Sequence, residues 1–119
     1  MKYDIFLISP VRNATEEQMN ALTSYMIKMK LAGKKVYYPA LDTDQNDNIG
    51  FRICTDNANA IALSEEVHIF YDPQSQGSLF DLGVAFGLAK PLKIINIDSL
   101  EKTEGKSFAN MIMEWQRKW

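Results

Sequence analysis

Strand-like and helix-like segments alternate four times along the chain, and this order constrains the fold more than any other feature. The strand-like runs are short and apolar and end at a proline or a polar loop, whereas the helical segments repeat apolar residues every three or four positions. The expected strands cover residues 3–9, 35–38, 67–71 and 92–97, and the expected helices cover about 15–31, 51–64, 78–89 and 107–115. Because each crossover returns the chain to the same end of the sheet, this order predicts parallel strands with helices on both faces.

Length and composition fit one α/β domain. The 119 residues are 46% hydrophobic and 24% charged, which is ordinary for a globular protein. We therefore expect a single Rossmann-like (flavodoxin-like) domain over residues 1–119, with a parallel sheet of four to five strands. A net charge of -2 gives no reason to expect binding to a nucleic acid polymer or an anionic membrane. The acidic Asp4 near the N-terminus and the lack of a long apolar run lead us to expect a cytoplasmic protein.

Several chemistries lack the residues that they need. The single cysteine, Cys54, and the single histidine, His68, are too few for an internal disulfide or a zinc site, and we expect both to be packing residues. The chain has no dinucleotide-binding fingerprint, phosphate loop or Gly-x-Ser-x-Gly elbow, so no cofactor and no serine hydrolase triad is expected. A phosphate-accepting receiver domain is a weaker alternative, because its acids would cluster at the end of the first strand, and Asp4 lies near the start.

Asp81 is the one acid in the otherwise apolar and small segment 77–89. It could complete a capping box with Ser78, or it could be a reactive carboxylate that the helix N-terminus keeps ionised. Ligands of open parallel sheets bind at the carboxyl ends of the strands. The predicted order places Asp81 at that edge together with Ser9, Arg12 and Asn13, which favours the reactive carboxylate.

The segment Gly77-Ser-Leu-Phe-Asp-Leu-Gly-Val-Ala85 resembles the specific motif of the nucleoside 2-deoxyribosyltransferase family, which includes the related 2'-deoxynucleoside 5'-monophosphate N-glycosidases. The resemblance runs from residue 3 to about residue 96 and also rests on Ile8-Ser9-Pro10, Tyr38-Pro39, residues 57–61 before residues 67–70, and Lys90-Pro91. It implies a carboxylate that attacks the anomeric carbon of a deoxyribose. In the family this residue is a glutamate, and Asp81, one methylene shorter, stands in its place.

The resemblance also implies roles for other residues. Asn57 matches a second family acid that acts at the base; an amide cannot donate a proton as an acid, so either the adjacent Asp56 takes this role or the role is absent. Arg12 and Ser75 resemble phosphate contacts of the nucleotide-hydrolysing branch, which favours a nucleoside monophosphate over a free nucleoside. We further expect substrate-binding contacts from Phe6, Ser9, Asn13 and Gly77.

Three hypotheses follow. The first is an enzyme that cleaves or transfers the N-glycosidic bond of a nucleoside or its 5'-monophosphate. The second is a non-catalytic nucleotide-binding or sensing module, and the third is a structural protein in which Asp81 only caps its helix. The resemblance implies a homodimer or a higher homo-oligomer, and the apolar C-terminal residues, ending in Trp119, could serve that interface or pack on their own sheet.

Overall fold

Four parallel strands form one sheet with the spatial order β2-β1-β3-β4. The computed structural model describes residues 1–119. The strands are β1 (Tyr3–Ile8), β2 (Val36–Tyr37), β3 (Ser64–Ile69) and β4 (Leu92–Ile94). The two central strands, β1 and β3, pair along most of their length and end in fully buried residues, as a sheet covered on both faces requires. This arrangement confirms the Rossmann-like, flavodoxin-like α/β fold predicted from the alternation of elements.

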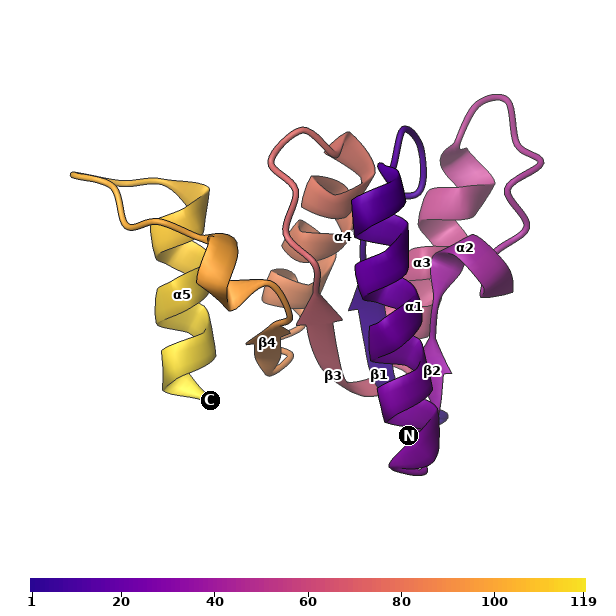
Figure 1. Ribbon diagram of the computed structural model, residues 1–119. Coiled ribbons are helices and arrows are strands. Elements are labelled where there is room, and N and C mark those ends of the chain that lie inside the picture. The colour runs from indigo at the N-terminus through magenta and orange to yellow at the C-terminus, as the bar shows by residue number, and fades with distance from the viewer.

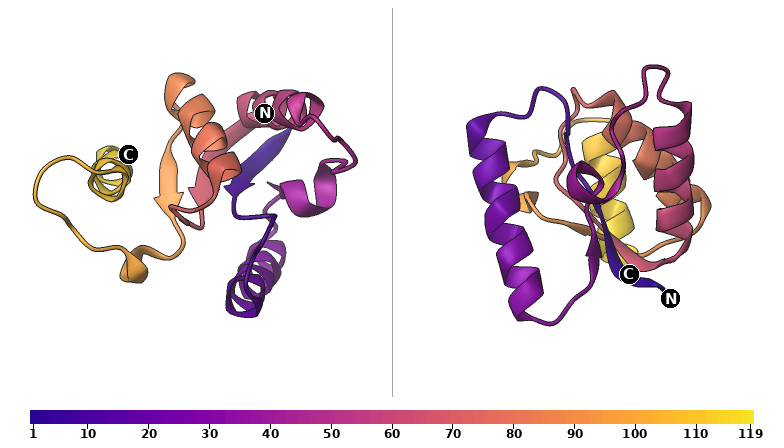
Figure 2. Two further views of the ribbon diagram at one scale, coloured as in Figure 1. Left: turned by 90° about the horizontal axis from the view of Figure 1, so that it is seen from above. Right: turned by 90° about the vertical axis from the view of Figure 1, so that its right-hand side faces the viewer.

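Helices cover both faces of the sheet (Figures 1 and 2). The long helix α1 (Glu16–Leu31) lies on one face, and α3 (Phe51–Ala62) and α4 (Gln76–Gly87) lie side by side on the other. Helix α5 (Phe108–Lys118) lies beside β4, and the short α2 (Pro39–Asp42) and the 3-10 turn η1 (Ile97–Ser99) connect larger elements. No helix combines the length and the apolar character that crossing a membrane requires.

Local side-chain bonds explain where several elements begin and end. Thr15 and Gln18 form the capping box predicted at the start of α1. Strand β4 ends three residues earlier than predicted, because the Asn96 side chain bonds the backbone N–H and C=O of Tyr71 and a 3-10 turn follows. Helix α2 was not predicted, although Pro39 at its first position suits a helix start.

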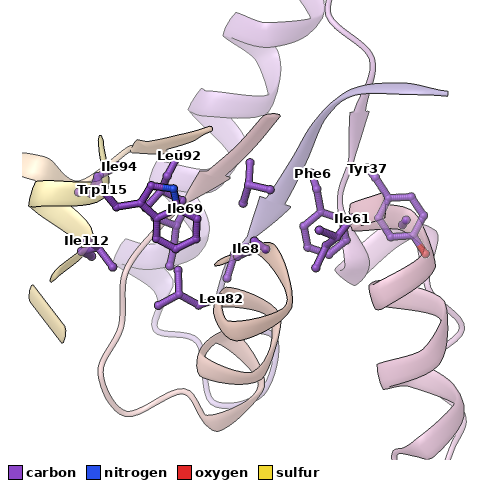
Figure 3. Packing of buried hydrophobic residues seen from close by; sticks show 13 residues of the cluster. Phe6, Ile8, Tyr37, Ile61, Ile69, Leu82, Leu92, Ile94, Ile112 and Trp115 are labelled. Atoms are coloured by element: carbon purple, nitrogen blue, oxygen red, sulfur yellow. The ribbon is translucent and has the colours of Figure 1, made fainter. Parts of the chain in front are cut away.

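The larger part of the core lies between the sheet and helices α3, α4 and α5 (Figure 3). Phe6 and Ile8 point from β1 into this layer, whereas Leu7, between them, points to the face that α1 covers, as the two-residue period of a strand requires. Phe6, which we expected to contact substrate, is fully buried here and stacks on Tyr37, with ring centroids 5.5 Å apart. The ring therefore contributes to the core and does not line the cavity described below.

A buried pair, Tyr25 and His68, joins α1 to the sheet and extends to the exposed Glu66. The Tyr25 hydroxyl bonds Nδ1 of His68, and Nε2 of His68 lies 2.9 Å from a carboxylate oxygen of Glu66. Burial lowers the pKa of His68, although Glu66 opposes this, and burial raises the pKa of Tyr25, which therefore keeps its proton for Nδ1. His68 is thus the buried residue that its position within a strand predicted, with both ring nitrogens bonded.

Candidate active site

Three chain segments enclose a cavity of about 420 Å³ at the carboxyl edge of the sheet, a volume within the usual range for small-molecule sites. The loops that follow β1 and β3 and the loop before α3 all rise at this edge (Figure 1). The strand order reverses between β1 and β3, so the cavity lies where open α/β sheets bind ligands. Its lining is mostly polar and comprises Ser9, Val11, Arg12, Asn13, Pro39, Gln45, Gly50, Ile53, Cys54, Asn57, Gln74, Ser75, Gln76, Gly77, Ser78 and Asp81.

Asp81 is the one carboxylate in this lining, and the residue is buried, with a relative exposure of 7%. Its Oδ2 atom accepts one side-chain hydrogen bond, from Nδ2 of Asn57 at 3.4 Å. Burial raises the pKa of Asp81 to about 7, and the bond from Asn57 partly opposes that rise. The carboxyl group therefore takes up its proton at a much higher pH than an exposed aspartate does.

The start of α4 corrects two expectations about Asp81. The helix begins at Gln76 with Ser75 as its N-cap, and the Ser75 hydroxyl accepts the backbone N–H of Ser78. Asp81 is therefore the sixth residue of the helix rather than part of its first turn, beyond the free N–H groups that stabilise an anion. The capping box with Ser78 is wrong, and so is the expectation that the helix end keeps Asp81 ionised, because desolvation dominates at this depth.

Asn57 lies on α3 with only 6% exposure, and its two amide atoms face different partners. Nδ2 donates to Asp81, and Oδ1 accepts a hydrogen bond from the Thr43 hydroxyl at 2.7 Å. The structure thus brings together Asn57 and Asp81, which are 24 residues apart in the sequence. The amide contacts the carboxylate directly and also lines the cavity.

Asp56, the alternative acid for the base side, does not line the cavity. Its carboxylate pairs with Nη1 of Arg52 at 3.1 Å, one helical turn earlier, and its side chain is 44% exposed. Neighbouring residues of a helix point about 100° apart, so Asn57 faces inward while Asp56 faces outward. The same arginine also bonds the backbone oxygens of Asp44 and Asn46 and thereby holds the preceding loop against α3.

The other end of the cavity presents hydrogen-bond donors and one cation. Gln76 and Gly77 occupy the first two positions of α4, and their backbone N–H groups have no partner within the helix. Arg12 and Asn13 line the same cavity from the loop after β1, where Asn13 has a left-handed backbone with φ of 57°. Donors at a helix N-terminus and a guanidinium suit an anionic group such as a phosphate.

Ser9 directly follows β1, lines the same cavity and is only 8% exposed. Its hydroxyl oxygen is buried and makes no hydrogen bond within the chain. Burial raises the pKa of Tyr38 and the nearby Ser9 hydroxyl opposes that rise, yet the two hydroxyls do not reach hydrogen-bond geometry. A buried hydroxyl without a partner at a cavity wall is suited to a polar atom of a ligand.

Sequence reasoning missed the lining residues that α3 and its N-cap Gly50 contribute beside Asn57. Gly50, Ile53, Cys54 and Asn57 recur at spacings of three and four, so extension from Asn57 along the helix would have found them. Cys54, expected to be a packing residue, lies at the cavity instead. Burial is the main cause that raises the pKa of its thiol, and the charge of Asp81 raises it further. The thiol is therefore a neutral group beside the carboxylate.

Comparisons with known proteins agree on the fold. No protein-family model matches the chain, and no curated protein matches it by sequence. Among solved structures, the chain is similar to a 2-deoxyribosyltransferase from Bacillus psychrosaccharolyticus, with a TM-score of 0.63 and 18% identity over 92% of this chain and 89% of that one. It is also similar to the TIR domain of a Toll-related receptor from Hydra magnipapillata, with a TM-score of 0.59 and 16% identity over 91% of this chain and 78% of that one. The chain therefore has the α/β fold that these two proteins share.

Proposed function

We propose that the protein cleaves the N-glycosidic bond of a nucleoside 5'-monophosphate, with Asp81 as the group that attacks or stabilises the anomeric carbon. The observation that carries the proposal is the position of Asp81, a buried carboxylate that lines a polar cavity at the ligand-binding edge of the sheet. The motif around Asp81 resembles that of the nucleoside 2-deoxyribosyltransferases, and a 2-deoxyribosyltransferase has the same fold. Water or a second nucleobase could accept the sugar, which would make the enzyme a hydrolase or a transferase.

The chemistry takes two steps. An oxygen of ionised Asp81 bonds to C1' of the sugar while the C1'–N bond breaks, and the bonding electron pair leaves with the base. Water, which gives up a proton to solvent, or a base nitrogen then bonds to C1'. The bond between C1' and the Asp81 oxygen breaks, and the carboxylate regains its original charge. Because an aspartate is one methylene shorter than a glutamate, the sugar must bind closer to α4 than a glutamate would require.

The departing base must take its proton from solvent in this site. Apart from Asp81, the cavity lining contains no carboxylic acid, and Asn57 offers a hydrogen bond but no transferable proton. Asp56 is paired with Arg52 outside the cavity. This arrangement favours slow turnover, and it is the specific observation that supports the second candidate, a nucleotide-binding module that does not turn over its ligand.

The phosphate of the substrate would bind at the donor-rich end of the cavity. Arg12 supplies a charge, and the free N–H groups of Gln76 and Gly77 supply fixed donors. Ser75 already caps α4 and donates its hydroxyl proton to Ser78. We therefore propose that Ser75 stabilises this helix end and lies at the edge of the phosphate site. The partnerless hydroxyl of Ser9 could bond a sugar or phosphate oxygen.

The direct test is a panel of deoxynucleosides and their 5'-monophosphates at high enzyme concentration, with free base separated by chromatography. We expect base release from at least one monophosphate and less from its matching nucleoside, and an added second base will show exchange if the enzyme is a transferase. No free base and no exchanged product anywhere in the panel would reject the enzyme. Calorimetric binding of a monophosphate without turnover, with no gain in Asp81→Glu, would support the binding module.

The phosphate assignment predicts a selective effect of Arg12→Ala. Loss of a charge-assisted contact of about 1.5 to 3 kcal/mol should lower kcat/KM for the monophosphate by roughly 10- to 100-fold. The matching nucleoside has no phosphate, so its kcat/KM should change by less than about twofold. Arg117→Ala removes an exposed arginine on α5 and is the matched control. An equal loss on both substrates would show that Arg12 supports the loop rather than the phosphate.

A further inference from the structure

We propose that the hydroxyl groups of Thr43 and Tyr37 position the Asn57 amide so that its N–H group is directed at Asp81. The inference rests on the proposed function of Asp81 and adds two residues that sequence analysis did not select. Neither residue lines the cavity, so both would act through Asn57 as positioning residues.

A chain of side-chain hydrogen bonds connects four elements of the fold. The Tyr37 hydroxyl, from β2, lies 2.6 Å from Oγ1 of Thr43, the C-cap residue of α2. Thr43 Oγ1 lies 2.7 Å from Oδ1 of Asn57 on α3, and Nδ2 of Asn57 lies 3.4 Å from Oδ2 of Asp81 on α4. All four residues are buried, with exposures between 5% and 8%.

The donor and acceptor capacities give this chain one direction. Asn57 Oδ1 can only accept, so the single Thr43 hydroxyl proton is used there. Thr43 Oγ1 must then accept from Tyr37, whose hydroxyl also reaches the Asp42 carbonyl at 3.3 Å. With its oxygen held by Thr43, the amide turns its N–H group toward the carboxylate. The opposite orientation would place two oxygen atoms together whenever Asp81 is ionised.

This direction favours the ionised carboxylate that the proposed reaction requires. Asn57 is the one group whose hydrogen bond offsets the desolvation of Asp81. Near Asp81, the neutral thiol of Cys54 lies on α3 and the Arg12 guanidinium lies across the cavity. At the far end of the hydrogen-bond chain, Asp42, Tyr3 and Asp56 act on the Tyr37 hydroxyl. Loss of the Thr43 hydroxyl would free the amide to rotate and leave Asp81 without a fixed donor.

Thr43→Val tests the inference because valine keeps the shape and removes the hydroxyl. Carbon-13 NMR of aspartate carboxyl groups, with the Asp81 signal assigned by its absence in Asp81→Asn, gives the titration midpoint without any substrate. We expect this midpoint to move to higher pH in Thr43→Val. If ionised Asp81 is the reactive form, kcat/KM should fall about fivefold at pH 6, the equivalent of one ordinary hydrogen bond, and stay within about twofold at pH 9.

Three further variants make the result specific. Thr43→Ser keeps the hydroxyl and should show the wild-type Asp81 midpoint and the wild-type pH dependence of kcat/KM. Tyr37→Phe should move the midpoint to higher pH by a smaller amount than Thr43→Val. Thr55→Val removes an exposed hydroxyl that bonds the Phe51 carbonyl on the same helix as Asn57 and should change neither profile. An unchanged Asp81 midpoint in folded Thr43→Val would overturn the inference, as would an equal loss of kcat/KM at both pH values. If Thr43→Val does not fold, an unchanged midpoint in Tyr37→Phe has the same consequence.

The NMR measurement also separates this inference from the proposed function. A protein that releases no base at all can still show the shifted Asp81 midpoint in Thr43→Val. In that case the hydrogen-bond chain stands and the assignment of the reaction fails. If the protein releases base and the Asp81 midpoint does not shift in Thr43→Val, the assigned reaction stands and the positioning role of Thr43 fails.

Discussion

Asp81→Asn is expected to reduce base release by at least about 10³-fold while the protein remains folded. The amide has nearly the same shape as the carboxylate and can still accept a hydrogen bond from Asn57 through its oxygen. It carries no negative charge to stabilise an oxocarbenium-like transition state and cannot form an ester with C1'. The measurement is kcat for the best monophosphate of the panel, with circular dichroism to verify the fold.

Asp56→Asn is the matched control because it makes the same chemical change at an acid outside the cavity. Asp56 lies beside Asn57 on α3 but points outward to Arg52, so its loss removes only a half-exposed ion pair of about 0 to 1 kcal/mol. We expect Asp56→Asn to keep its turnover within about threefold. If Asp56→Asn lost activity and Asp81→Asn kept it, the two acids would have been assigned to the wrong roles.

The order of elements could be predicted because it depends on local periodicity and on turn residues near each boundary. Apolar runs such as residues 3–9 identify a buried strand, and Thr15 with Gln18 marks a helix start without any tertiary information. The start of α4 could not be decided in this way, since Ser75 and Ser78 are both suitable N-caps. The structure selects Ser75, whose backbone N–H closes a turn with the Asp72 carbonyl.

The environment of Asp81 could be predicted even less, because residues far away in the sequence create it. The position of the carboxylate at the sheet edge follows from the order of elements, and its burial follows from the packing of α4 against α3. The hydrogen bonds that partly offset its desolvation span 24 residues to Asn57 and a further 14 to Thr43. No local pattern in the sequence indicates those two contacts.

The substitution that abolishes turnover is also expected to stabilise the folded protein at alkaline pH. The Asp81 carboxyl has its ordinary pKa of 3.8 in the unfolded chain and a pKa of about 7 in the folded protein, so the folded state binds more protons between these values. Its contribution to stability is therefore fully present below pH 3.8 and is lost as pH rises to about 7, by of order 4 kcal/mol. Asn cannot ionise, so Asp81→Asn should avoid this loss at pH 9 and gain little at pH 4. Urea unfolding at several pH values measures the difference.

In the wild-type protein, His68 adds a second pH dependence to the free energy of unfolding, and its sign is opposite to that of Asp81. Its folded pKa is lowered by burial, so stability falls as pH drops below about 6.5, where the unfolded histidine binds a proton more readily. Both proteins contain His68, and subtraction of the two profiles removes its contribution. Parallel profiles for wild type and Asp81→Asn would show that Asp81 ionises normally in the folded protein.

One ionisation should then control both stability and turnover. Above the folded pKa of Asp81 the carboxylate is charged in both the folded and the unfolded state. The difference in unfolding free energy between the two proteins therefore no longer changes with pH. The same charged form is the nucleophile, so wild-type kcat/KM should reach half of its plateau at that pH. A half-maximal pH well below the pH at which the stability difference levels off would mean that a group other than Asp81 limits the reaction. If the half-maximal pH of kcat/KM agrees with the pH at which the stability difference levels off, the same ionisation of Asp81 destabilises the fold and activates the nucleophile.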